Sequence, residues 1–231
     1  MRHKFSFTLL FQVPPLSFAR TNHRWLNRLL GDWSLGSTGF YQTGLPIDVR
    51  LVRPDVVYVD QAGKVFLKPA SGRQAVLNVP GGGSSVVAFR PNLIPGANPY
   101  LKNDRNFLNP EAFSIPAVGQ LGDLSRGAIR APRIRLVDLS VQKIFKLDNN
   151  DEEGKTLTFN MDITNLFNFT NFKLPSAKLP NALGTEANEL QPSQAFSPDA
   201  AKNFGILKTT FKRKTDLGSS RQIQFGLSLK F

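Results

Sequence analysis

The chain has 231 residues, of which 41% are hydrophobic and 20% are charged, a composition typical of a folded protein. Its net charge of +12 is compatible with nucleic acid, an anionic membrane surface or an acidic substrate as partner. Cysteine is absent, which excludes disulfides, a thiolate nucleophile and cysteine metal sites in this sequence. No apolar run approaches the ~18 residues of a transmembrane helix, whereas a transmembrane β-strand needs only about 9 to 11 residues.

The N-terminal segment alternates between apolar and polar residues. Large apolar side chains occupy the odd positions from Phe5 to Val13, and polar side chains occupy most even positions before Pro14-Pro15. A basic, apolar start also fits a secretory signal peptide. Because the core of a signal peptide has no reason to alternate, the period of two predicts a strand at about 3–13.

Four later segments carry a similar pattern, at about 32–49, 136–147, 155–168 and 221–231. The segment 32–49 is rich in glycine and aromatic residues and alternates more loosely. Strands on a soluble core alternate too, but they usually run to about five or six residues, and these segments are longer. In a bilayer only a closed barrel pairs every backbone group of a sheet. The sequence therefore predicts an all-β fold, with about five antiparallel strands that belong to a transmembrane β-barrel.

The connections between these strands alternate in length. Residues 148–155 form a short polar connection, whereas residues 53–135 and 169–220 form long ones. Outer-membrane barrels have short periplasmic turns and long extracellular loops, so we expect both long connections on the extracellular side. A spanning strand at 204–212 would break the alternation of short and long connections, so we expect these residues to lie in the last loop. Residues 23–30 are expected to form a short amphipathic helix on the inner membrane surface.

Three motifs carry a family resemblance. The segments "GDLSRGAIRAPRIRLVDLSVQKIFKL", "LTFNMDITNLFNFTNF" and "RQIQFGLSLKF" are similar, in order and spacing, to the C-terminal end of TonB-dependent outer-membrane receptors. They particularly resemble the Oar-like group, which carries a carboxypeptidase-regulatory-like domain. The resemblance implies a C-terminal fragment with about five of roughly 22 strands, without the plug and N-terminal domains. It also implies energy delivered by TonB through the missing plug.

The resemblance assigns a role to the last strand. The barrel assembly machinery would read an assembly signal made of Phe225, Leu227, Leu229 and Phe231. The alternative is that Phe231 only belongs to the aromatic girdle of the barrel.

Polar residues of the strands are candidates for the barrel lumen, where they would line the wall against a plug: Asp138, Gln142, Asn160, Asp162, Gln222 and Gln224. Basic residues at the extracellular side could meet lipopolysaccharide phosphates or an anionic ligand. These candidates are Arg130, Arg133, Arg135, Lys212 and Arg213, for which simple solvation is the alternative. Nucleic acid is not expected as a partner, because the aromatic residues occupy the apolar faces instead of interleaving with the basic residues.

Enzyme signals are weak. The chain has two histidines, the "GGGSS" segment lacks the Lys-Ser/Thr of a phosphate-binding loop, and "DNNDEEG" has Glu153 where a calcium loop needs glycine. We therefore expect no enzyme activity and no cofactor. The expected function is solute uptake by a TonB-dependent transporter in the bacterial outer membrane. Its partners would be membrane lipid and lipopolysaccharide, the rest of the barrel and plug, the assembly machinery, TonB and an unknown solute. The alternative is a secreted or surface all-β module that binds a glycan or a protein.

Overall fold

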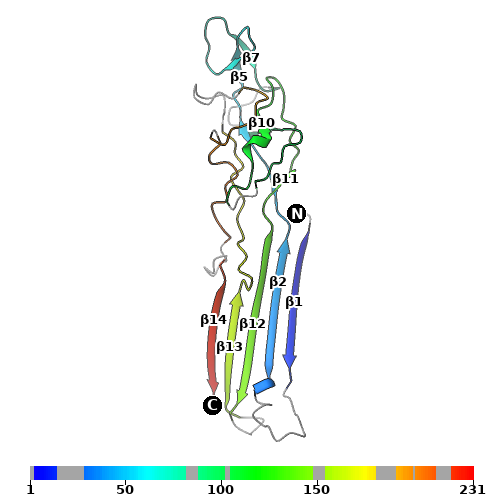
Figure 1. The fold of residues 1–231 in the computed structure, drawn as a ribbon, viewed down its shortest axis with the longest axis vertical. Coiled ribbons are helices and arrows are strands. Elements are labelled where there is room, and N and C mark those ends of the chain that lie inside the picture. Colours follow the sequence, from blue (N-terminus) through cyan, green and yellow to red (C-terminus); the bar gives the residue numbers. More distant parts are fainter. Residues whose placement is uncertain are drawn as a thin grey trace. The chain divides into compact units, whose positions relative to one another are not determined.

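The computed structural model describes residues 3–14, 29–81, 88–101, 105–147, 154–180, 191–199, 201–211 and 220–231. The chain divides into two compact units (Figure 1). Unit 1 contains Met1–Thr43, Arg133–Asn171 and Thr210–Phe231, and unit 2 contains Gly44–Pro132 and Phe172–Thr209. Unit 2 is therefore built from the two long connections of the sequence. No helix in the described ranges is both long enough and apolar enough to cross a membrane.

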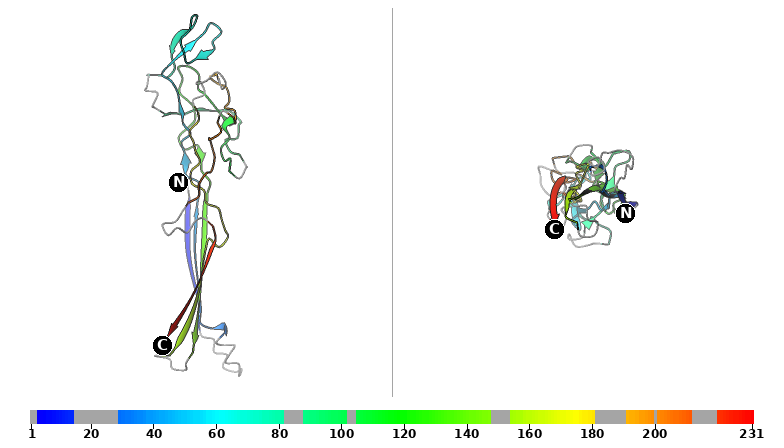
Figure 2. Two further views of the ribbon diagram at one scale, coloured as in Figure 1. Left: turned by 90° about the vertical axis from the view of Figure 1, so that its left-hand side faces the viewer. Right: turned by 90° about the horizontal axis from the view of Figure 1, so that it is seen from below.

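Unit 1 is a five-stranded antiparallel sheet with the order β1-β2-β12-β13-β14. Its strands are β1 (Lys4–Val13), β2 (Trp33–Gln42), β12 (Ile134–Lys146), β13 (Thr156–Thr164) and β14 (Gln222–Lys230). Figure 2 shows the sheet almost edge-on as a single twisted layer. This sheet confirms the predicted all-β antiparallel fold class.

The strand boundaries differ in detail from the predicted ranges. Within the range 32–49, β2 ends at Gln42, and Pro46–Ile47 forms β3 of unit 2, which pairs with β11 (Ile129–Arg130). The chain leaves the large sheet there because its backbone finds new partners: Ala131 N donates to Leu45 O at 2.8 Å. Residues 204–211 form no strand of the large sheet, and Ile206 instead makes an isolated bridge to Asn106.

Unit 2 contains only short strands. A three-stranded sheet joins β6 (Val65–Phe66), β5 (Val56–Val59) and β7 (Gln74–Leu77). Two further pairs are β4 (Leu51–Val52) with β8 (Ala88–Phe89), and β9 (Asn92–Leu93) with β10 (Phe113–Ser114). A single turn of 3₁₀ helix, η1 (Pro110–Ala112), begins after Asn109, whose side chain accepts a hydrogen bond from Glu111 N.

The two long connections share one hydrophobic core. Phe113 from the first connection and Phe204 from the second are buried, and their ring centroids lie 5.5 Å apart in an edge-to-face arrangement. Leu179 and Phe196 of the second connection are buried in the same cluster. Apolar burial of this kind is the main favourable term in folding, so the two connections stabilise each other as one folded body.

A buried arginine ties the loops of unit 2 together. Arg53 is 1% exposed, and its guanidinium donates to backbone oxygens of Asn78, Pro116, Ala117 and Gln120, at 2.6 to 3.2 Å, and to Asn78 Oδ1. Burial lowers the pKa of Arg53 below its usual value, because desolvation disfavours the charged form. The carbonyl oxygens compensate this cost, because they accept hydrogen bonds from the charged guanidinium. Arg53 thereby links three backbone segments.

We predict that Arg53→Met destabilises unit 2. The substitution keeps an unbranched side chain but leaves several buried carbonyl oxygens without a donor, which we expect to cost on the order of 3 kcal/mol. Urea-dependent proteolysis of the whole protein measures this change. Arg105→Met is the matched control because Arg105 is exposed in the same unit. Equal protease resistance of the two variants would contradict the role given to Arg53.

Candidate functional site

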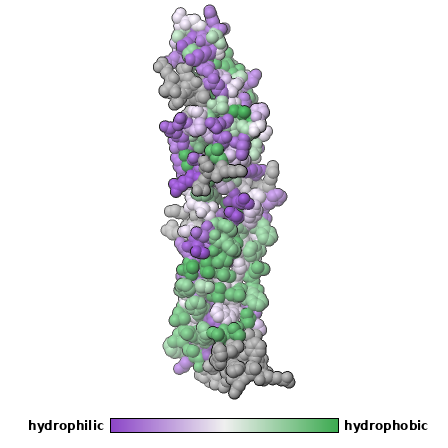
Figure 3. All heavy atoms as spheres, viewed as in Figure 1, coloured by the Kyte–Doolittle hydropathy of each residue, from purple (hydrophilic) through white to green (hydrophobic). Residues whose placement is uncertain are grey.

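One face of the five-stranded sheet is apolar along almost its whole length. The strand register places on this face the odd-numbered residues of all five strands, among them Phe7, Leu9, Leu35, Leu139, Met161, Phe225 and Leu227. Several of these side chains are open to the surroundings: Phe225 is 65% exposed and Leu227 is 71% exposed. The described residues of unit 1 provide no second layer that covers this face. Figure 3 shows hydrophobic residues gathered over these strands.

The apolar face is built from cross-strand contacts. Phe159 of β13 and Phe225 of β14 have ring centroids 6.1 Å apart. Phe7 of β1 lies opposite Gly39 of β2, and a Cβ atom at Gly39 would come within 1.9 Å of the Phe7 ring. The glycine therefore lets the ring lie flat over the neighbouring strand, which keeps this face smooth.

A lysine interrupts the apolar face near one end of the sheet. Lys143 of β12 is fully buried, and its Nζ donates to Gly31 O. The same Nζ lies 5.5 Å from the Trp33 ring centroid and 5.2 Å from that of Phe145. Trp33 Nε1 in turn donates to Leu29 O at 2.9 Å. The lysine ammonium group is thus held by the carbonyl oxygen of Gly31, just before β2 begins, and by two aromatic rings of the same face.

An arginine and aromatic rings lie at the opposite end of this face. Arg135 of β12 is exposed, and its guanidinium carbon lies 4.3 Å from the Phe169 ring centroid. Phe167 lies next to Phe169, with ring centroids 5.6 Å apart, and Tyr41 is the cross-strand partner of Arg135. Both ends of the apolar face therefore combine a cation with aromatic side chains, whereas the strand centres between them carry no charged side chain on this face.

The other face of the sheet is mainly polar. The register places on this face the six residues predicted for the lumen: Asp138, Gln142, Asn160, Asp162, Gln222 and Gln224. Ser140 Oγ donates to Asp162 Oδ1 at 2.5 Å across the β12–β13 pair. Gln142 is the cross-strand partner of Asn160. In the described residues, no group of three or more His, Cys, Asp or Glu side chains is arranged to hold a metal ion.

Asp138 has a structural partner at the end of β13. Its Oδ1 accepts a hydrogen bond from Asn165 N at 2.8 Å. Asn165 is buried and has a φ of 55°, and its side chain donates to Phe169 O and accepts from Phe169 N, both at 2.9 Å. Asparagine is one of the few residues that adopts this left-handed conformation readily. The contacts make Asp138 a brace for the turn that follows β13.

Two more asparagines hold the neighbouring strands at the same end. Asn171 accepts a hydrogen bond from Arg135 N at 2.8 Å and donates to Arg135 O at 2.7 Å. Asn168, with a φ of 53°, accepts from Arg221 N at 2.9 Å. The segment "NLFNFTN" therefore connects β12, β13 and β14 where the second long connection starts. Sequence reasoning missed this role, although three asparagines at a spacing of three were a visible signal.

The predicted basic candidates do not form one cluster. Arg130 belongs to unit 2, where its backbone N donates to Tyr100 Oη at 2.8 Å. Arg133 and Arg135 belong to unit 1, and both are exposed. Lys212 and Arg213 lie outside the described residues, as do most of the predicted helix at 23–30 and the short connection at 148–155.

The residues of the predicted assembly signal lie on or beside β14. Phe225, Leu227 and Leu229 point to the apolar face, and Phe231 follows the last paired residue of the strand. All four are exposed. This placement is compatible with both a sorting signal and a lipid-facing girdle, so the signal stays a prediction.

A family comparison gives this geometry its context. The family model described as "Outer membrane beta barrel domain" matches residues 1–224. The chain belongs to this family. Family membership supports a location in the bacterial outer membrane. No match was found among curated proteins or among solved structures.

For an outer-membrane β-barrel domain, the two cation positions agree with the thickness of the membrane. At about 3.4 Å per residue, Arg135 and Lys143 are roughly 27 Å apart along β12. At a strand tilt of about 35–45° this distance becomes roughly 20 Å across the bilayer, close to the apolar band of about 25 Å in such barrels. Exposed apolar side chains between the two positions are then the surface that contacts lipid.

We predict that arginine is tolerated on one face of β14 and not on the other. Leu227→Arg places a charge in the apolar band and should destabilise the protein in a bilayer by about 2–4 kcal/mol. Gln224→Arg is the matched control on the polar face of the same strand. The urea midpoint of each variant in membranes, read from heat-modifiable mobility on gels, measures the difference. Equal midpoints would contradict the assignment of the two faces.

Proposed function

We propose that this chain forms part of the wall of a TonB-dependent outer-membrane transporter, as in the Oar-like group, and contributes to solute uptake. The observation that carries the proposal is a sheet with one exposed apolar face and one polar face, whose outer strands β1 and β14 pair with no further strand among the described residues. Such edges bind other strands and cause aggregation unless they are paired. The sheet therefore needs further strands before it can serve as a stable barrel wall.

Strand direction limits how the barrel closes. Every neighbour in the sheet is antiparallel, so β1 and β14 run in the same direction. Joining β1 to β14 directly, within one copy or between copies, would create a parallel pair. Bacterial outer-membrane barrels have an even number of antiparallel strands, so an odd number of additional strands is needed. This requirement fits a barrel of roughly 22 strands, the size of the plugged transporters, and disfavours a ring of identical copies.

The long connections support a capture role. The first long connection leaves the end of β2 and returns at the start of β12, and the second leaves the end of β13 and returns at the start of β14. Because neighbouring strands alternate in direction, all four of these strand ends lie at the same end of the sheet. In this family of barrels, long loops belong to the extracellular side. A folded unit with its own hydrophobic core offers a fixed surface to an incoming solute. In the proposal the protein performs no chemical reaction on that solute.

The predicted residues take roles consistent with this assembly. The six residues of the polar face line the lumen against a plug that other parts of the transporter supply, and the plug connects to TonB. Arg135 at the extracellular boundary contacts lipopolysaccharide phosphates, since arginine binds phosphate bidentately. The barrel assembly machinery inserts the strands, with Phe225, Leu227, Leu229 and Phe231 as the signal that it reads.

Uptake measurements in the native host test the proposal. Strains lacking this gene, lacking TonB or lacking both are compared for growth and uptake on a panel of limiting nutrients. We expect at least one nutrient for which the three strains show the same loss of uptake, because the transporter cannot work without TonB. Uptake that still depends on this gene when TonB is absent would contradict the proposal.

Membrane extraction distinguishes the proposed transporter from a surface binding module. An integral barrel wall should stay in the outer-membrane fraction after alkaline carbonate washing and should need detergent for solubilisation. Release by carbonate as a water-soluble monomer would contradict the transporter and favour a surface module that binds a glycan or a protein.

A further inference from the structure

Unit 2 contains a pocket of about 570 Å³ that none of the predicted functions accounts for. Its lining comes from three segments of unit 2: Asp48, Arg50, Phe89, Arg90, Leu121, Gly122 and Arg126. The volume lies within the range of small-molecule sites in proteins, about 300–1,000 Å³. All lining residues belong to one unit, so the pocket is a property of that unit alone.

The backbone around the pocket is well fixed. Arg50 N donates to Ala177 O at 2.9 Å, and Arg50 O accepts from Leu179 N at 2.7 Å, which holds Arg50 in a bridge to the second connection. Phe89 is held in β8 by pairing with Leu51 of β4. These contacts place side chains that are distant in sequence around one cavity.

A glycine allows the third wall to approach. A Cβ atom at Gly122 would lie 2.0 Å from Arg90 O, so any other residue would push the two segments apart. Leu124 N donates to Pro91 O at 3.2 Å, and Arg90 donates through Nη1 to Leu124 O at 3.0 Å. Close approach at Gly122 therefore positions the Arg90 side chain in the pocket wall.

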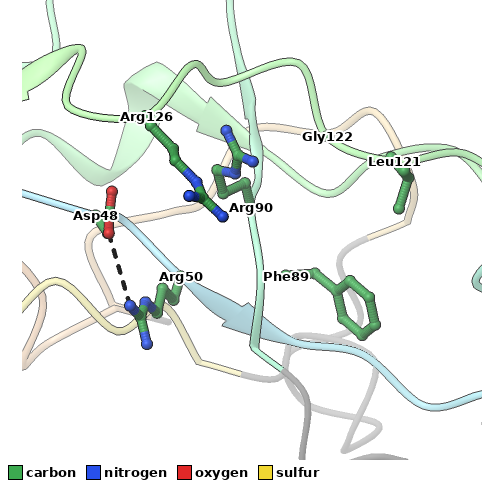
Figure 4. Close-up of a pocket in the computed structure, with 7 residues that line it drawn as sticks. All are labelled: Asp48, Arg50, Phe89, Arg90, Leu121, Gly122 and Arg126. Carbon is green, nitrogen blue, oxygen red and sulfur yellow. Dashed lines mark ion pairs between the residues drawn. The ribbon is translucent and has the colours of Figure 1, made fainter. Parts of the chain in front are cut away.

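The charges of the pocket do not balance. Three arginines face one carboxylate, Asp48, which lies 3.6 Å from Arg50. Both partners of this ion pair are about half exposed, and such pairs contribute little to stability. In Figure 4 the guanidinium groups of Arg50, Arg90 and Arg126 lie on the side of Asp48. This arrangement offers more hydrogen-bond donors than Asp48 can use, so an anion can bind them, although Asp48 competes with that anion for Arg50.

The opposite side of the pocket is apolar. Phe89 and Leu121 lie away from the guanidinium groups in Figure 4, and Leu121 is 62% exposed. An exposed leucine beside an aromatic ring gains free energy when a ligand covers it. The pocket thus combines a cationic end with an apolar end.

We propose that this pocket binds a small soluble amphipathic anion, in which a carboxylate or phosphate group joins an apolar or aromatic body. The oxyanion contacts Arg50, Arg90 and Arg126, because guanidinium groups match carboxylate and phosphate oxygens in bidentate geometry. The apolar body packs on Phe89 and Leu121. That this anion is also the transported solute rests on the proposed function, whereas binding itself does not.

Binding to the whole protein in detergent micelles tests the proposal with a defined probe, 2-naphthyl phosphate, followed by calorimetry. Inorganic phosphate represents the anionic group alone, and 2-naphthol represents the uncharged body alone. We expect 2-naphthyl phosphate to bind at least about tenfold more tightly than either fragment, since it occupies both ends. Binding of 2-naphthol as tight as that of its phosphate ester would overturn the proposal.

Variants locate the binding. Arg50→Gln and Arg126→Gln should each weaken 2-naphthyl phosphate binding by about tenfold, the scale of a charged hydrogen bond. Arg105→Gln, an exposed arginine of unit 2 that does not line the pocket, should leave it unchanged. Phe89→Ala should weaken the ester but leave inorganic phosphate unaffected. Unchanged binding in both arginine variants would overturn the proposal.

One variant predicts a gain, which a folding defect cannot produce. Asp48→Asn removes the competing carboxylate at nearly constant volume, so 2-naphthyl phosphate should bind severalfold more tightly. No gain in Asp48→Asn, or arginine-dependent binding of purified lipopolysaccharide without binding of 2-naphthyl phosphate, would overturn a soluble anion as the ligand. Because no step needs TonB, failure here would leave the uptake experiment of the proposed function intact.

Discussion

Backbone pairing in hydrocarbon is the constraint on which the structure depends. Inside a bilayer an N–H or C=O group without a partner costs several kcal/mol, so a sheet crosses only when each strand is paired on both sides. Within the five strands this pairing runs across the sheet, from the pair of β1 with β2 at one edge to the pair of β13 with β14 at the other. In the described part of the chain the two outer strands have one neighbour each. Because they run in the same direction, an odd number of further strands is needed to complete an antiparallel barrel. The exposed apolar face and the need for further strands are thus consequences of one requirement.

The ends of the strands solve a different problem, which is the change from hydrocarbon to water. At one end the Lys143 ammonium group donates to the carbonyl oxygen of Gly31 and lies beside the rings of Trp33 and Phe145. At the other end, the side chains of Asn168 and Asn171 replace ladder hydrogen bonds by binding backbone groups of Arg221 and Arg135. From this end the chain enters the long connections, whose core is held by apolar packing and by Arg53. One chain therefore combines a sheet whose apolar face contacts lipid with a unit whose apolar residues are buried in a hydrophobic core.

Sequence alone predicted the sheet well because alternation is a local property. The period of two assigned the faces of Phe159 and Gln224 without knowledge of their neighbours, and the register agrees. Long-range pairing was not predictable in this way. Nothing in the spacing of Arg50, Arg90 and Arg126 indicates that Gly122 brings their segments together, and the buried role of Arg53 depends on carbonyl oxygens of residues far along the chain. Glycine and asparagine occupy the critical positions, but their partners follow only from the three-dimensional fold.

Accessibility along β14 tests the central claim most directly, that lipid covers the apolar face. Because this sequence lacks cysteine, single cysteines can be introduced at 222–229 and spin-labelled in the bilayer-embedded protein. The account predicts collision with oxygen, which partitions into lipid, at 223, 225, 227 and 229, and collision with a water-soluble nickel complex at 222, 224 and 228. Low accessibility to both reagents at 225 and 227, as beneath a second protein layer, would contradict it.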